Sequence, residues 1–198
     1  MEEAEMFDLE RELKDYEMPL DGREKFFTKV DDFWNTAWNR KFMQSFDGYA
    51  DKYRDTVELL YEKLDDRLKK DKAAYPMMFL CRHCIELRLK SIIVELQKLK
   101  GEQENITGHN LCELWEKLDA LYDLSSKDGV YSNAYHLISE LHNYDRKSDA
   151  FRYPIHNNGT PVQIAEFVDL DVFYCTFRKL DIFLEGIQSE AQNALNVE

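Results

Sequence analysis

The return of apolar residues at helical spacing is the feature of this sequence that most restricts its fold. From residue 49 to residue 68 an apolar side chain recurs every three or four positions, and the positions between are mostly charged. The apolar positions are Tyr49, Tyr53, Val57, Leu60, Leu64 and Leu68. Residues 74–100 continue the spacing and are followed by Gly101, a residue type that commonly ends helices. Because this period places apolar side chains on one face of a helix, we expect two long amphipathic helices here.

The same period predicts shorter helices elsewhere in the chain. They cover residues 8–16, 26–38, 110–124, 131–144 and 169–195. With only 7 Gly and 4 Pro among 198 residues, the composition favours packed helices over a sandwich or a barrel. We therefore predict an all-α fold, with an antiparallel helical bundle over residues 71–198 and N-terminal helices over residues 1–70 that pack on the bundle or extend it.

Residues 151–165 interrupt the helical period. Aromatic and apolar residues alternate with polar ones through FRYPI, and Asn158-Gly159 is a dipeptide typical of tight turns. Pro154 fits an extended segment, because proline has no amide hydrogen and disfavours helical backbone at the residue before it. We expect a small β-hairpin in this stretch.

Charge and hydropathy restrict the location and the partners of the chain. Its formal net charge of -13 opposes broad attachment to duplex DNA or to anionic membranes. No apolar run reaches the about 18 residues that a membrane span needs, and the acidic N-terminal stretch is unlike a secretory signal. We expect a soluble cytoplasmic protein whose four cysteines are reduced.

Arg82, Glu86 and Lys90 follow one another at four-residue intervals within the predicted central helix. On a helix they form one polar file beside the apolar stripe. Two interpretations stand: a salt-bridge ladder on a solvated face, or a polar site that contacts a ligand.

Two further motifs have structural and functional interpretations. Cys81 and Cys84 form a Cys-x-x-Cys pair, but the chain offers no second pair of ligands at zinc spacing. Both lie on the apolar stripe, where cysteine packs as a small apolar residue, so we expect no metal and no cofactor. His109 precedes a predicted helix and would either cap that helix or approach a substrate. Asp145 and Arg146 belong to a polar turn shortly before Arg152, which is either a solvated loop or part of a site.

Three segments in order resemble the HEPN (higher eukaryotes and prokaryotes nucleotide-binding) family. They are LCRHCIELRLKSII, GHNLCELWEKL and DRKSDAFRYP, and the resemblance covers residues 74–187. It implies a bundle of antiparallel helices that commonly pairs as a homodimer around the polar helix face. Proteins of this family act either as metal-independent endoribonucleases of toxin–antitoxin and phage-defence systems, or as non-catalytic modules that bind nucleotides or a partner protein.

The resemblance assigns roles to residues of this sequence. In the endoribonuclease, Arg152 stabilises charge on the phosphate, and His156 or His109 acts as acid or base. The remaining candidates for substrate or nucleotide binding are Arg82, Glu86, Lys90, Asp145 and Arg146. In the non-catalytic alternative the same residues hold the 151–165 segment to the bundle, with Arg152 paired to Glu86 or Asp145. A third possibility is a regulatory protein that binds a basic partner encoded by a neighbouring gene.

Overall fold

The computed structural model describes residues 37, 45–123, 129–155, 158–162 and 164–195. Contacts divide the chain into two compact units, Met1–Asn39 and Arg40–Glu198. The helices predicted over residues 8–16 and 26–38 lie outside the described residues, apart from Ala37. All the structure reported below belongs to the second unit.

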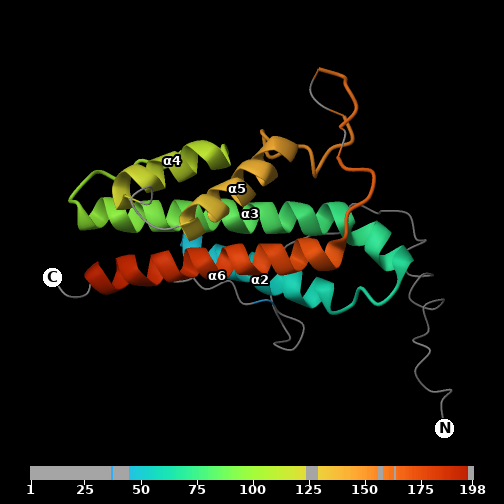
Figure 1. Ribbon diagram of the computed structural model, residues 1–198, viewed down its shortest axis with the longest axis horizontal. Helices are drawn as coiled ribbons and strands as arrows, with labels where there is room; N and C mark the ends of the chain where they lie inside the picture. Colours follow the sequence, from blue (N-terminus) through green and yellow to red (C-terminus); the bar gives the residue numbers. More distant parts are fainter. Residues whose placement is uncertain (1–36, 38–44, 124–128, 156–157, 163, 196–198) are drawn as a thin grey trace, which may run out of the picture. The chain divides into compact units, whose positions relative to one another are not determined.

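All the elements of regular secondary structure in the described part of this unit are α-helices, which confirms the all-α class (Figure 1). Its helices are α2 (Phe46–Tyr61), α3 (Arg67–Leu99), α4 (Leu111–Tyr122), α5 (Gly129–Tyr144) and α6 (Leu170–Leu195). Helices α2, α4 and α6 all pack against α3, and α5 packs against α4 and α6. Among the described helices, none combines the length and the apolar character that a bilayer span requires.

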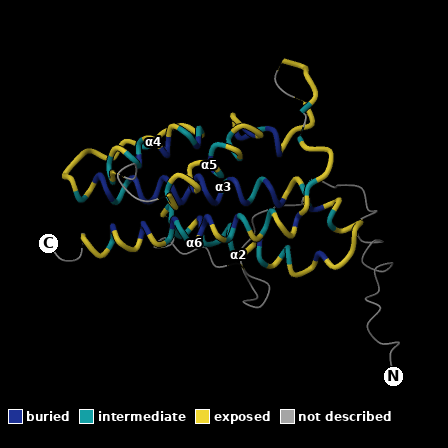
Figure 2. The backbone as a smooth tube through the Cα atoms, viewed as in Figure 1, coloured by how far each residue is buried: buried dark blue, intermediate teal, exposed yellow. Residues whose placement is uncertain are grey.

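The central helix α3 is buried on nearly all sides over its middle and C-terminal half (Figure 2). A helix in that position meets neighbours on every face, so its polar residues are enclosed together with its apolar ones. The buried polar side chains of α3 are Arg82, Glu86, Arg88, Lys90, Ser91 and Gln97. Because a buried charge is costly unless it is paired, these residues need partners within the protein.

The single helix predicted over residues 49–68 is wrong at its C-terminal end. Helix α2 ends at Tyr61, and after a short turn the side chain of Asp66 accepts a hydrogen bond from the Lys69 amide at 2.9 Å. This N-cap starts α3 at Arg67, seven residues before the predicted start at 74. Aspartate at this position satisfies an amide that the first turn of a helix leaves without a partner.

The predicted β-hairpin of residues 151–165 is reduced to one isolated antiparallel bridge, between Ile155 and Pro161. The Val162 amide donates to the Pro154 carbonyl at 2.9 Å, and Gly159 takes a positive φ of 83° in the turn. No residue in the described part of the chain belongs to a strand. A longer ladder is disfavoured because proline at 154 and at 161 removes a donor from each side.

Candidate functional site

The polar file of α3 is enclosed by the bundle. Arg82 is 0% exposed, Glu86 is 1% exposed, and Lys90 is also buried. Their burial rules out the interpretation as a ladder on a solvated helix face. The file instead anchors the segments that lie beside it.

Arg82 connects α3 to the segment that precedes α4 and to the turn that follows α5. Its Nη1 donates to Glu86 Oε2 at 2.8 Å, its Nη2 to the His109 carbonyl at 2.6 Å, and its Nε to the Asp145 carbonyl at 3.1 Å. All three guanidinium nitrogens therefore have partners within the protein. A phosphate cannot reach this enclosed group, so Arg82 acts as a brace and not as an accessible ligand for an anion.

Asp145 shapes the turn that follows α5. Its Oδ1 accepts hydrogen bonds from the amides of Asp149 at 2.7 Å and Ala150 at 2.9 Å. Its Oδ2 lies 3.3 Å from Arg82 Nε without forming a hydrogen bond, because that N–H points at the Asp145 carbonyl. Asp145 is completely buried, and Arg82 provides its positive charge. The brace thus fixes the start of the segment that carries Arg152.

Glu86 is the acceptor that three side chains share. Lys90 Nζ and His109 Nδ1 each lie 2.8 Å from its Oε1, and Arg82 occupies its Oε2. Burial alone would raise the pKa of Glu86, but the hydrogen bonds from Lys90, Arg82 and His109 outweigh it and lower the pKa. Glu86 is therefore a carboxylate at neutral pH.

His109 is the accessible member of this cluster. Its side chain is 62% exposed although its Nδ1 contacts the buried Glu86. It does not cap α4: that role belongs to Asn110, whose Oδ1 accepts from the amides of Cys112 and Glu113. A buried carboxylate on one ring nitrogen orients an imidazole and leaves its other edge free for a ligand.

Arg152 lies outside the buried cluster. It is exposed, its Nε donates to the Ser148 carbonyl at 2.7 Å, and its guanidinium lies 5.6 Å from the Phe79 ring centre and 5.3 Å from that of Tyr153. No ion pair joins Arg152 to either candidate carboxylate in the described part of the chain. The brace expected of Arg152 in the non-catalytic alternative is made by Arg82 instead.

Of the two remaining candidates, Arg146 does not join this cluster. Arg146 is exposed on the turn after α5, and its Nη2 donates to Asn143 at 3.3 Å. His156 lies outside the described residues, so the predicted pairing of Arg152 with His156 stays a prediction.

Sequence reasoning missed an aromatic surface beside the polar file. The rings of Phe79 and His83 stack at 5.8 Å, and Tyr53 of α2 meets His83 edge-on at 4.6 Å. Burial is the main cause that lowers the pKa of His83, and the nearby charges of Arg82, Lys90 and His109 lower it further against the raising effect of Glu86. Phe79 and His83 precede Glu86 by seven and three residues. This helical spacing could have predicted that they share the face of α3 that carries Glu86.

A second charge cluster, also missed, surrounds Arg88 on another face of α3. The guanidinium is almost fully buried and contacts Asp181 at 3.2 Å, Asp51 at 2.9 Å and Glu185 at 3.1 Å, as well as Asp47. These carboxylates belong to α2 and α6, so Arg88 joins three helices. The position of Arg88 between Leu87 and Leu89 was the sequence feature that could have indicated a buried charge.

The Cys-x-x-Cys pair is part of the apolar core. Cys81 and Cys84 lie in the apolar core, as predicted, and burial raises the pKa of each thiol above its usual value. Nowhere in the described ranges do three His, Cys, Asp or Glu side chains gather as a group able to hold a metal ion.

Comparison with known proteins gives no relative: no family model matches the chain, and neither the curated proteins nor the solved structures include a match. The accessible chemistry of the described unit therefore guides the functional assignment. It includes His109, oriented by Glu86, and the exposed Arg152 beside its aromatic neighbours.

Proposed function

We propose that this chain is a HEPN-like, metal-independent endoribonuclease in which His109 supplies the acid–base group. The observation that carries the proposal is the exposed His109 imidazole held at 2.8 Å by the buried carboxylate of Glu86. A carboxylate that orients a histidine is a recurring arrangement in acid–base catalysis, because it selects the ring tautomer and stabilises the protonated ring.

The reaction that suits this group is attack by an RNA 2′-hydroxyl on its own phosphate. His109 Nε2 would take the 2′-hydroxyl proton while Nδ1–H donates to Glu86. The 2′-oxygen would form a bond to phosphorus, the bond from phosphorus to the 5′-oxygen would break, and the leaving oxygen would receive a proton from the imidazolium. The products are a cyclic phosphate and a free 5′-hydroxyl.

Arg152 is the proposed phosphate contact. Arg82 is enclosed, whereas Arg152 is exposed and makes no ion pair in the described part of the chain. A guanidinium fork matches phosphate oxygens and stabilises the negative charge that develops on them. Stacking near Phe79 and Tyr153 limits the positions of the Arg152 side chain without covering it. We further propose a cytoplasmic homodimer, which would bring two copies of this face together.

A second candidate is the non-catalytic module that binds a nucleotide or a partner protein. It is favoured by the enclosure of Arg82 and Asp145, which work as a brace, and by the net charge of -13, which opposes RNA. In that case the exposed His109 and Arg152 recognise a ligand without reacting with it.

Incubation of the purified protein with mixed single-stranded RNA in the presence of EDTA separates the two candidates. The endoribonuclease should release fragments ending in cyclic phosphate, and His109→Ala should slow cleavage by about 100-fold or more, the usual contribution of an acid–base group. His136→Ala, which removes an exposed histidine of α5, is the matched control and should retain activity. Arg152→Ala should lose activity while Arg146→Ala keeps most of it.

The outcomes have distinct meanings. Intact RNA with the wild-type protein contradicts the endoribonuclease. RNA or nucleotide binding without cleavage, weakened by Arg152→Ala, would support the non-catalytic module instead. If the protein neither binds nor cleaves RNA or nucleotides, both nucleic-acid functions are lost and a protein partner remains.

A further inference from the structure

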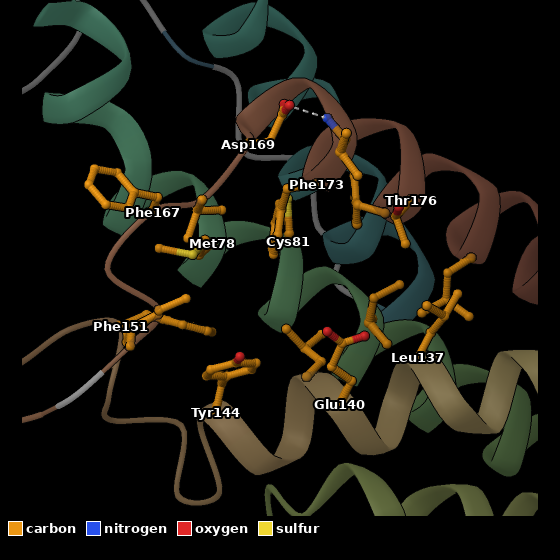
Figure 3. Close-up of a pocket in the computed structure, with 18 residues that line it drawn as sticks. Met78, Cys81, Leu137, Glu140, Tyr144, Phe151, Phe167, Asp169, Phe173 and Thr176 are labelled. Carbon is orange, nitrogen blue, oxygen red and sulfur yellow. Dashed lines mark hydrogen bonds between the residues drawn. The ribbon is translucent and has the colours of Figure 1, made fainter. Parts of the chain in front are cut away.

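A cavity of about 380 Å³ lies between α3, α5, α6 and the chain segment leading into α6 (Figure 3). Its floor is made by buried apolar side chains of α3 and α6. These are Met78, Cys81, Ile85, Phe177 and Leu180. A cavity of this size is within the usual range of small-ligand sites, which are mostly apolar with a few polar groups.

The mouth of the cavity exposes apolar surface to solvent. Phe167 is 81% exposed, and Val172 and Tyr144 are also exposed at the rim. An apolar molecule that enters the cavity covers the exposed apolar side chains at the rim. Its own apolar surface and that of the rim are then both removed from water, which favours binding.

The charged groups that the described residues contribute to the lining all have one sign. Glu140 and Asp169 contribute carboxylates, and no described Lys, Arg or His belongs to the lining. The Asp169 Oδ1 caps α6 by accepting from the amides of Asp171 and Val172. Glu140 forms no ion pair with any described residue, and Figure 3 shows its carboxylate rising from α5 into the cavity near Leu137. Glu140 is thus the group available to a ligand.

We propose that this cavity binds a small molecule with an apolar chain and a positively charged amine, the chain lying on the buried floor and the amine at Glu140. An ammonium group would donate charge-assisted hydrogen bonds to the Glu140 carboxylate. A ligand with an anionic head would meet two carboxylates and no cationic side chain among the described lining residues. The site does not include His109, Glu86 or Arg152, so it does not depend on the proposed ribonuclease activity.

A matched series of eight-carbon ligands tests the proposal by calorimetric titration of the full chain: octylamine, 1-octanol and octanoate. Octylamine should bind about tenfold more tightly than octanol, which corresponds to about 1.4 kcal/mol, and octanoate should bind most weakly. Shortening the amine from eight to six carbons should weaken binding by about 15-fold, since each methylene contributes about a fourfold factor.

Variants locate the site. Glu140→Gln should remove the preference for the amine and leave octanol binding unchanged, while Glu116→Gln, an exposed glutamate of α4, should change neither. Thr176→Phe fills the cavity and should abolish binding of all three ligands; if it fails to fold, Ala165→Trp in the loop wall makes the same test. Three results would each overturn the proposal: no binding of octylamine, equal binding of the three ligands, or binding that survives a folded cavity-filling variant.

Discussion

Arg82→Met should destabilise the protein strongly without removing an accessible binding group. The methionine side chain matches that of arginine as far as Nε, so the main loss is the guanidinium and its partners. The His109 and Asp145 carbonyls lose their side-chain donor, and the buried Asp145 carboxylate loses its cation. Glu86 is less affected, because Lys90 and His109 still donate to it.

The magnitude follows from those groups. Removing one member of a buried ion pair typically costs about 3–5 kcal/mol, and each buried acceptor left without a donor costs about 1–3 kcal/mol when it cannot reach water. The costs overlap because the same guanidinium serves both carbonyls and the carboxylate, so we expect a total of about 4 kcal/mol. For a domain of this size that corresponds to a fall in Tm of about 8–16 °C.

Thermal and urea denaturation of Arg82→Met measures the loss. Arg67→Met is the control, because Arg67 is exposed and lies 4.0 Å from an exposed Asp71, so its removal should leave Tm nearly unchanged. Adding Asp145→Asn to Arg82→Met removes the unpaired buried charge and should recover part of the stability. A loss below about 1 kcal/mol, the range of surface ion pairs, would refute the assignment of Arg82 as a buried brace.

Three further predictions concern stability and its pH dependence. Arg88→Met should cost about 3–5 kcal/mol in urea denaturation, because it leaves carboxylates of α2 and α6 beside a buried position without their cation; an unchanged urea midpoint would contradict this. The folded pKa of Glu86 is below its ordinary value of 4.5. The contribution of this carboxylate to the free energy of unfolding is therefore complete above pH 4.5 and is lost as the pH falls through the folded pKa. Glu86→Gln should therefore flatten the acid side of a plot of urea midpoint against pH, and an unaltered slope would argue against the shared carboxylate. Burial lowers the folded pKa of His83 below 6.5, so the unfolded chain takes up this proton first and stability falls as the pH drops below that value. NMR titration of the His83 ring should give a midpoint below 6.5, and His83→Gln should lack this pH-dependent loss of stability; a midpoint at or above 6.5 would be inconsistent with the partly buried ring.

The helices could be predicted because the spacing of apolar residues within each segment is enough to indicate a helix. The apolar spacing of residues 131–144 and 169–195 gave α5 and α6 to within two residues at each end. The boundary between α2 and α3 was missed because the apolar stripe continues through the turn, as Leu64 is buried there and Leu68 already belongs to α3. At that boundary the cap formed by Asp66 overrides the apolar period.

The site was predictable only in part. Spacing placed Arg82, Glu86 and Lys90 on one helix face, but spacing does not tell whether that face meets water or other helices. Burial and the partners at His109 and Asp145 depend on segments that are distant in sequence. Arg82, expected as a binding residue, is the buried brace, whereas Arg152 is exposed and does not make the ion pair with Glu86 or Asp145 that the non-catalytic alternative expected of it.

The sequence by itself determined the helical class and the polar file, because both follow from a period of 3.6 residues and from residue type. Only the tertiary structure decided which charges are enclosed and which remain accessible. Enclosure arises when α2, α4 and α6 pack around α3, and each buried charge then requires a partner within the protein. The same packing leaves His109 at the surface on a buried carboxylate, and it leaves the Glu140 cavity open between α3, α5 and α6.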